Sequence, residues 1–237
     1  MDDREANSAA SAGGTFGKDH AGEYDRRNSA LRPISDCLHF LLGMVLSRLP
    51  ENARILCVGV GTGSEILALA KDRPGWHFTG VDPSAEMLAV ARRRLGEAGI
   101  AARCRLVEGY VDDVEEEGFD AVVSLFVAHF VAREDRPLFY RNICDRLADK
   151  GMFASAEISG DLRRNDYEAM LYDWTQVQSR MAGAGKSVDE IDGVLRRALT
   201  VLNPEQTETM WQEAGFDPPV SFYQAFMIRG WYATKNA

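Results

Sequence analysis

The chain has 237 residues and a mass of 26.3 kDa, which suffices for one large α/β domain or for one domain with a cap. Hydrophobic residues make up 46% and charged residues 27%, the ordinary proportions of a globular protein in water. The formal net charge of −9 argues against nonspecific binding to nucleic acid or to anionic membranes, because both need a basic surface. A tRNA held by a local basic patch stays open as a substrate.

The cysteines and the apolar runs exclude further classes. The 4 cysteines show no C-x-x-C or paired spacing, so we expect neither a metal nor a redox motif. Cys57 and Cys104 lie inside apolar, strand-like runs and are expected to be reduced core residues. We find no apolar run of membrane-spanning length and no signal-peptide pattern at the N-terminus, and we therefore expect a cytoplasmic protein.

Residues 1–22 are polar and rich in Gly, Ala and Ser, so a disordered tail is expected there. We see no internal repeat or long linker after them, which predicts a single domain over residues 23–237. Its first element is an amphipathic helix that ends near Pro50, indicated by leucines and a valine at helical spacing: Leu41, Leu42, Val45, Leu46 and Leu49.

From residue 54 onward, short apolar runs alternate with helical patterns. This regular alternation predicts a parallel sheet with helices on both faces. The first run does not alternate between apolar and polar residues, which is typical of a strand buried on both sides. The predicted strands are Arg54–Gly59, His77–Asp82, Ala102–Glu108, Phe119–Ser124 and Met152–Ile158, and the predicted helices between them are Ser64–Lys71, Ser84–Leu95 and Asp135–Leu147.

The alternation then stops. Residues 161–202 are helix-rich, with a capping box at Ser187 and Glu190, and we expect them to form a helical cap over the C-terminal edge of the sheet. Asn203-Pro204 opens a further helix. The last two strand-like runs, Val220–Tyr223 and Phe226–Lys235, are too close for a crossover helix, so they must pair antiparallel or form one bent strand.

Three alternating glycines, Gly59, Gly61 and Gly63, end the first strand and begin the first helix of the alternation. Glycine lets the backbone pass close under a ligand and point amide groups at it. A tight turn with no ligand is the alternative interpretation. A dinucleotide fingerprint, G-x-G-x-x-G, needs its third glycine at position 64, which is Ser64 here, so the spacing disfavours NAD.

Asp82 ends the second strand, where an acid can accept hydrogen bonds from both ribose hydroxyls of an adenosine. An acid at this place can also serve the dipole of the following helix. Its combination with the glycine turn favours the ribose role. Pro83 and Met87 then offer apolar surface to an adenine ring, although Met87 is equally suited to the core.

Four stretches together resemble successive motifs of class I S-adenosylmethionine-dependent methyltransferases, and the resemblance covers roughly residue 23 to the C-terminus. It implies the Rossmann-like methyltransferase fold: a mostly parallel seven-stranded sheet with a C-terminal antiparallel hairpin, here with the helical cap as an insertion. The stretches are Val58-Gly59-Val60-Gly61-Thr62-Gly63, Thr79-Gly80-Val81-Asp82-Pro83-Ser84, Val107-Glu108-Gly109-Tyr110-Val111-Asp112-Asp113 and Phe119-Asp120-Ala121-Val122.

The resemblance also implies S-adenosyl-L-methionine as the cofactor and assigns residues to its parts. The three glycines would line the methionine moiety and Asp82 would hold the ribose. Tyr110 and Val111 would lie beside the adenine, and Leu125 near the sulfonium. Similar small methyltransferases close a Tyr and an Arg from upstream of the first strand over the cofactor carboxylate, and the candidates here are Tyr24 and Arg32.

Two positions depart from the family pattern. The family usually carries an acid two residues before the first glycine, where this chain has Cys57. It often carries another acid after the glycine of the third motif, where this chain has Tyr110. We therefore expect other groups, with Asp112 as a candidate, to help orient the cofactor.

The sulfonium of the cofactor is an activated methyl donor, so positioning and exclusion of water are the main tasks of the protein. A base is needed only for a protonated nucleophile, and His129 after the fourth strand is the candidate, with a buried structural role as the alternative. Without an N-P-P-Y-like tetrapeptide, methylation of base amines is disfavoured. We expect a small, partly hydrophobic acceptor and a monomer or homodimer, with Trp174, Tyr223, Met227 and Arg229 as candidate acceptor contacts.

Three other functions stay open. The layout also resembles a tRNA-modification enzyme of the carboxy-S-adenosylmethionine synthase type. A noncatalytic cofactor-binding subunit that scaffolds a partner is a second alternative. An NAD-dependent dehydrogenase is the most distant, because of the glycine spacing.

Overall fold

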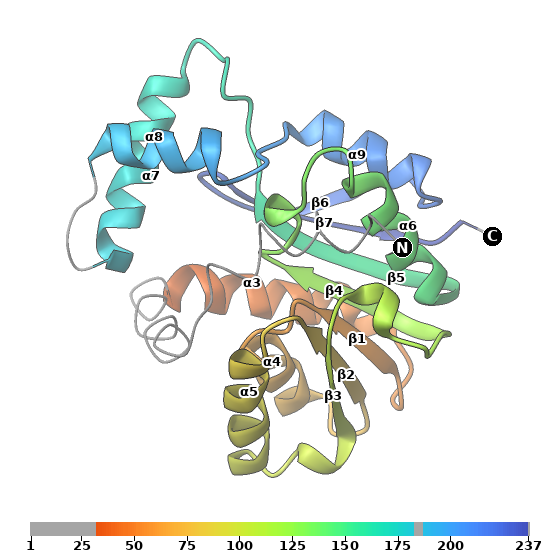
Figure 1. Cartoon of the computed structure of the whole chain (residues 1–237). Coiled ribbons are helices and arrows are strands. Elements are labelled where there is room, and N and C mark those ends of the chain that lie inside the picture. The colour runs from red at the N-terminus through yellow and green to blue at the C-terminus, as the bar shows by residue number, and fades with distance from the viewer. Residues whose placement is uncertain (1–31, 183–186, 237) are drawn as a thin grey trace, which may run out of the picture.

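The computed structural model describes residues 32–182 and 187–236, without the side chains of residues 180–182. It contains one seven-stranded sheet in the order β3-β2-β1-β4-β5-β7-β6. Strands β1 to β5 run parallel, and β7 lies antiparallel between β5 and β6 (Figure 1). The strands are β1 (Arg54–Val58), β2 (His77–Asp82), β3 (Cys104–Glu108), β4 (Phe119–Leu125), β5 (Leu147–Ile158), β6 (Val220–Ala225) and β7 (Ile228–Thr234).

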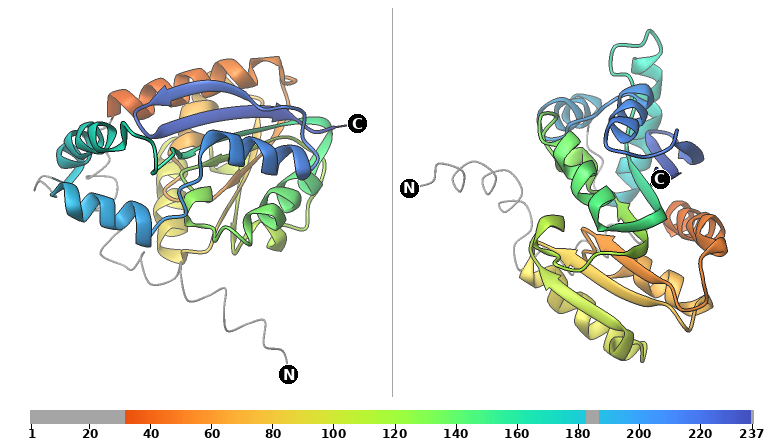
Figure 2. Two further views of the ribbon diagram at one scale, coloured as in Figure 1. Left: turned by 90° about the horizontal axis from the view of Figure 1, so that it is seen from above. Right: turned by 90° about the vertical axis from the view of Figure 1, so that its right-hand side faces the viewer.

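Helices cover both faces of the sheet, as Figure 2 shows from two further directions. One face packs against α3 (Arg32–Val45), α4 (Ser64–Asp72) and α5 (Ala85–Glu97), and the other packs against α6 (Arg136–Arg146) and α9 (Pro204–Glu213). Successive β1 residues point to opposite faces: Ile55 and Cys57 join the first set of helices, and Leu56 and Val58 join the second. The prediction of a first strand buried on both sides is therefore confirmed.

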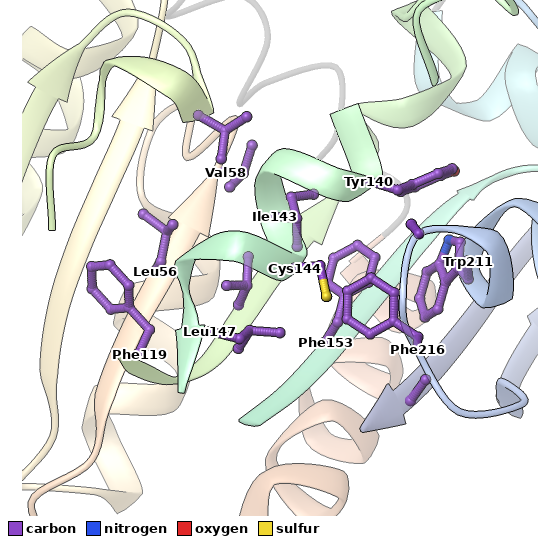
Figure 3. Packing of buried hydrophobic residues seen from close by; sticks show 14 of the residues in the cluster. Leu56, Val58, Phe119, Tyr140, Ile143, Cys144, Leu147, Phe153, Trp211 and Phe216 are labelled. Carbon is purple, nitrogen blue, oxygen red and sulfur yellow. The ribbon is translucent and has the colours of Figure 1, made fainter. Parts of the chain in front are cut away.

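The core between the sheet, α6 and α9 is rich in aromatic rings (Figure 3). Phe153 of β5 lies with its ring centroid 4.2 Å from that of Trp211 and 5.4 Å from that of Phe216. All three side chains are at most 1% exposed. Aromatic pairs at such distances bury large apolar areas, so this cluster fixes β5 and α9 relative to the rest of the sheet.

The helices α7 (Tyr167–Ala182) and α8 (Val188–Arg197) stand apart from the two layers, at the left of Figure 1. A third apolar cluster joins them to the sheet: Tyr167 and Trp174 of α7 pack with Ile191 of α8, Leu38 of α3 and Tyr223 of β6. The predicted capping box is present, because Ser187 Oγ accepts the amide of Glu190 and the Glu190 carboxylate accepts the amide of Ser187.

Several element bounds differ from the predicted ones. β5 begins at Leu147 rather than Met152, because the chain pairs with β4 at once and accommodates Lys150, at a φ of 60°, through a register shift. β3 begins at Cys104 rather than Ala102, because residues Ala101–Arg103 form a 3-10 turn. The predicted disordered tail, residues 1–22, lies outside the described residues. Within the described part, we find no helix that is long and apolar enough to cross a membrane.

Candidate functional site

The strand order reverses its direction at β1: β2 and β3 lie on one side of β1, and β4 and β5 lie on the other side. In an open parallel sheet, such a reversal opens a crevice at the carboxyl ends of the strands, where ligands bind. The glycine turn follows β1 at this place, and the loop of Phe126 and Val127 follows β4. The sheet topology thus brings the strongest sequence motif to the expected position.

The three glycines have positive φ angles of 69°, 49° and 79° at Gly59, Gly61 and Gly63. Only glycine adopts this left-handed conformation without strain. Gly59 is also required by space, because a Cβ atom there would lie 2.2 Å from Cγ2 of Val127. The turn after β1 therefore rests directly on the loop after β4.

The amide groups of these glycines are already used within the protein. Gly59 N–H donates to the Val81 carbonyl at 2.8 Å, and Gly63 N–H donates to the Val60 carbonyl at 2.8 Å. Gly61 N–H donates to Oδ2 of Asp82 at 2.9 Å. In this structure the three glycine amides therefore shape the turn, and their contact with a ligand stays a prediction.

Asp82 links this turn to the next helix. Its Oδ2 accepts Gly61 N–H, and its Oδ1 accepts Ser84 N–H at 2.9 Å. A carboxylate oxygen has two lone pairs, so each oxygen can accept one more hydrogen bond. Burial raises the pKa of Asp82, and the amides of Ser84 and Gly61 lower it in part. Two fixed acceptor sites side by side match a pair of neighbouring hydroxyls.

The residues expected around the adenine lie at the ends of β2 and β3. Gly109 N–H donates to the Asp82 carbonyl at 3.1 Å, which brings the loop after β3 next to Asp82. In that loop Tyr110 is 45% exposed and Val111 is buried in the core. Asp112 and Pro83 are exposed, whereas Met87 is 4% exposed and Leu125 is half-buried.

Two polar residues beside the turn were missed by the sequence interpretation. Nη1 of Arg94, on α5, donates to the Thr62 carbonyl, to Thr62 Oγ1 at 2.8 Å and to Ser64 Oγ at 3.2 Å, so it braces the turn. Glu65, in the first turn of α4, is buried with 8% of its surface exposed. An arginine in the run Arg92-Arg93-Arg94 and a glutamate at a helix start are usually solvent-exposed, so the sequence carried no signal for either contact.

His129 is also buried, at 3% exposure, and its Nδ1 accepts the backbone N–H of Ile158 at 3.2 Å. Burial lowers the pKa of His129 to about 3, with a smaller contribution from the Arg136 guanidinium. A neutral imidazole that accepts at Nδ1 carries its proton on Nε2, which leaves no free lone pair for a substrate proton. This geometry favours the structural alternative over the role of a base.

Three of the four candidate acceptor contacts lie in one buried cluster. Trp174, Tyr223 and Met227 are 3%, 8% and 0% exposed and belong to the apolar cluster that joins α7 and α8 to the sheet. Tyr223 Oη donates to the Ile34 carbonyl at 3.1 Å. These side chains join the helices α7 and α8 to the sheet in this structure. Arg229 lies in β7 opposite Glu157 of β5 and is half-buried.

The remaining candidates lie at the N-terminal end. Arg32 is the first residue of α3 and is exposed. Tyr24 falls outside the described residues. Among the side chains that the structure describes, no group of three or more His, Cys, Asp or Glu residues is arranged to hold a metal ion.

The sequence matches the family model of a methyltransferase domain over residues 55–151, which include the glycine turn and Asp82. A carboxy-S-adenosyl-L-methionine synthase of Chromohalobacter salexigens is 32% identical over 206 residues, 83% of this chain and 74% of that protein. An enzyme of the same name from Campylobacter hominis is 30% identical over 118 residues. That match spans about half the length of each protein, 49% of this chain and 50% of the relative.

Solved structures agree on the fold. The S-adenosylmethionine-dependent methyltransferase SibL superposes with a TM-score of 0.65 at 20% identity, covering 89% of this chain and 56% of SibL. PigF, solved with S-adenosylhomocysteine, has a TM-score of 0.59 at 20% identity. The match covers 83% of this chain and 55% of PigF. The chain belongs to the class I S-adenosylmethionine-dependent methyltransferase family.

Proposed function

We propose that this chain binds S-adenosyl-L-methionine at the carboxyl ends of β1 and β2 and transfers its methyl group to a small, partly hydrophobic acceptor. The observation that carries the proposal is the carboxylate of Asp82. It is anchored to Gly61 and Ser84, and each of its oxygens keeps a lone pair for a ribose hydroxyl. The left-handed glycines beside it leave the backbone bare of side chains where the methionine part would pass.

The remaining contacts follow the strand ends. Pro83, Met87, Tyr110 and Val111 would flank the adenine, and Asp112 would help to orient the cofactor. Leu125, at the end of β4, would lie near the sulfur. Arg32 and Tyr24 are the candidates for closing over the cofactor carboxylate.

The bound cofactor supplies a methyl group that is already activated on a sulfonium, so the protein has to align the acceptor and exclude water. The role of His129 as a base stays a prediction, and its use of Nδ1 for Ile158 N–H counts against it. An acceptor that arrives deprotonated would need no base. Arg229 is the candidate partner for an acidic group of the acceptor.

We infer a second candidate function from the Chromohalobacter salexigens relative: conversion of S-adenosylmethionine to its carboxylated derivative. It shares the cofactor site with the first candidate and differs in what happens at the methyl group. The third candidate function is that of a noncatalytic subunit that binds the cofactor and scaffolds a partner. We also propose that the protein works in the cytoplasm as a monomer or homodimer.

Mass spectrometry of the ligand that co-purifies with the full chain separates these functions. The methyltransferase predicts S-adenosylmethionine or S-adenosylhomocysteine, whereas the synthase predicts a heavier, carboxylated molecule. Incubation with S-adenosylmethionine carrying a labelled methyl group and a panel of phenols, amines and carboxylic acids then tests the transfer. Tight binding without turnover of any acceptor, together with a stable hetero-complex in pull-downs, would favour the noncatalytic subunit.

A further inference from the structure

Glu65 is a buried acid beside the glycine turn, and the proposed function gives it no role. It is the second residue of α4, with only 8% of its surface exposed. Glu205, the second residue of α9, is exposed at the corresponding place. Carboxylates are seldom buried unless they are paired, because the charged form loses its hydration.

The groups around Glu65 do not supply such a pair. The thiol of Cys57 comes from β1, the carboxylate of Asp82 from β2 and the guanidinium of Arg94 from α5, and all three act on it electrostatically. Its own backbone amide favours the ionised form, but within the described residues no cation lies within ion-pair distance of its carboxylate. Nη1 of Arg94 contacts Thr62 and Ser64 instead.

This environment keeps the acid protonated at neutral pH. Burial, with a smaller contribution from Asp82, raises the pKa of Glu65 to about 8, although its own backbone amide and Arg94 lower it in part. Cys57 is fully buried, and burial raises the pKa of its thiol well above the usual range. Of these two titratable groups on β1 and α4, the Cys57 thiol and the Glu65 carboxyl group, Glu65 is therefore the one that ionises more readily.

A role in the helix dipole does not explain the burial. An acid in the first turn interacts with the helix dipole equally well when it is exposed, as Glu205 is. In the buried position the carboxylate loses more to desolvation than the dipole returns, since its pKa rises instead of falling. The residue is thus better suited to receive a cation than to cap the helix.

We propose that Glu65 binds the α-ammonium group of the cofactor's amino-acid end and gives up its proton when the cofactor binds. This inference rests on the proposed function, which places the amino-acid end over the glycine turn. A cation in contact with a carboxylate stabilises its ionised form, so the bound state holds Glu65 as an anion. The free state holds it neutral, and the proton leaves to solvent.

The pH dependence of binding follows from this exchange. Between pH 6 and 7.5, free Glu65 is mostly protonated and the bound form is ionised, so the association constant rises by up to about tenfold per pH unit. Near pH 8 the rise ends, because free Glu65 is then ionised as well. An α-amino group itself titrates at about pH 7.7–8.0, so measurements should stay at or below pH 7.5.

The test is isothermal titration calorimetry of the full chain with S-adenosylhomocysteine, which carries the same amino-acid end. Titrations at pH 6.0, 6.5, 7.0 and 7.5, each in phosphate and in Tris or imidazole, give the number of protons released from the difference in heat. Wild type should release close to one proton. Glu65→Gln, which keeps the size and removes the charge, should release none, bind roughly tenfold more weakly at pH 7.5 and lose the pH dependence. Glu205→Gln, the matched acid of α9, should behave like wild type.

The outcomes separate this inference from the proposed function. No binding of S-adenosylhomocysteine to wild type would overturn the proposed function itself. If wild type binds and Glu65→Gln has the same affinity and releases the same number of protons, the role of Glu65 alone is overturned. Thermal unfolding of the ligand-free variants at pH 8.5 checks folding: Glu65→Gln should melt no lower than wild type, because it removes a buried charge. A large loss of stability would instead assign Glu65 to the helix and contradict the inference.

Discussion

Oδ2 of Asp82 and the backbone N–H of Gly61 are joined by a hydrogen bond of 2.9 Å, which fastens the glycine turn after β1 to the end of β2. The two residues are 21 positions apart in the sequence and belong to different elements. Gly61 has a φ of 49°, and its amide reaches the carboxylate in this conformation. The carboxylate that we propose as the ribose contact is thus held in place by the protein itself.

Asp82→Asn should weaken both the turn and the binding of cofactor. The amide side chain has one acceptor atom where the carboxylate had two, so either Gly61 or Ser84 loses its partner. We expect a loss of about 1–3 kcal/mol in the free energy of unfolding, measured by urea denaturation. Asp120→Asn is the control: it removes an acid that also accepts a backbone N–H, that of Arg54, far from the glycine turn, and it should leave cofactor affinity unchanged.

Gly59→Ala should destabilise the fold through contact with one side chain. The new methyl group would lie 2.2 Å from Cγ2 of Val127, and the φ of 69° adds strain. We expect a loss of more than about 1 kcal/mol in the free energy of unfolding. In a double-mutant cycle with Val127→Ala, which removes that methyl group, part of the loss should be recovered. Additive losses would show that the contact with Val127 is not the cause.

The control for this cycle is Gly61→Ala. A Cβ atom at Gly61 has open space, with nothing nearer than the Gly59 carbonyl at 4.0 Å, so Val127→Ala should give no recovery there. The backbone strain of a left-handed alanine is common to both glycine variants. The difference between the two cycles therefore isolates the steric contact.

The ion pair of Arg136 and Glu157 should be far more important for stability than the surface pairs. Nη1 of Arg136 lies 2.9 Å from Oε2 of Glu157, and both side chains are almost completely buried. Glu157→Leu leaves a buried charge unpaired, so we expect a loss of about 3–5 kcal/mol in chemical denaturation. Glu97→Gln breaks the exposed pair with Arg93 and should cost less than about 1 kcal/mol. Equal effects of the two substitutions would contradict this assignment.

His129 should make the stability depend on pH in the acid range. Its pKa is lowered from 6.5 to about 3, so the unfolded state binds one more proton than the folded state between these values. Its contribution is complete above pH 6.5 and is lost as the pH falls towards 3, by up to about 1.4 kcal/mol per pH unit. His129→Asn keeps an acceptor for Ile158 N–H and does not titrate, so the variant should lose less stability than wild type between pH 6 and 4.

The same variant tests the catalytic alternative. If His129 is a base, His129→Asn should lower kcat by about 10²-fold or more with little change in stability at pH 7.5. If its role is structural, kcat for any acceptor identified should change by only a few-fold. The hydrogen bond from Ile158 leads us to expect the second result.

The sequence analysis was most successful where local pattern and topology agree. The strand β2 and the cap residue Ser84 were predicted correctly, because a buried apolar run and a serine before a helix each have a strong local signal. Trp174, Tyr223 and Met227 were predicted as acceptor contacts and lie in a buried cluster. An aromatic residue has the same appearance in a sequence whether it lines a pocket or fills a core.

The contacts of Glu65 and Arg94, in contrast, could not be predicted from the sequence. Their helices were predicted, but the burial of Glu65 and the contact of Arg94 with Thr62 depend on how α4 and α5 lie against the glycine turn. Helical periodicity places a residue on a face, and it does not report what that face meets. The sequence shows a cysteine at position 57. It does not show that the carboxyl group of Glu65, from another element, lies near that cysteine.

The central claim is that the anchored carboxylate of Asp82 and the glycine turn bind the cofactor. Titration calorimetry with S-adenosylhomocysteine at pH 7.5, on wild type, Asp82→Asn and Asp120→Asn, tests it most directly. We expect wild type and Asp120→Asn to bind one ligand per chain. Asp82→Asn, with its folded state checked by thermal denaturation, should lose at least tenfold in affinity. Absence of binding by wild type, or equal affinity in folded Asp82→Asn, would contradict the claim.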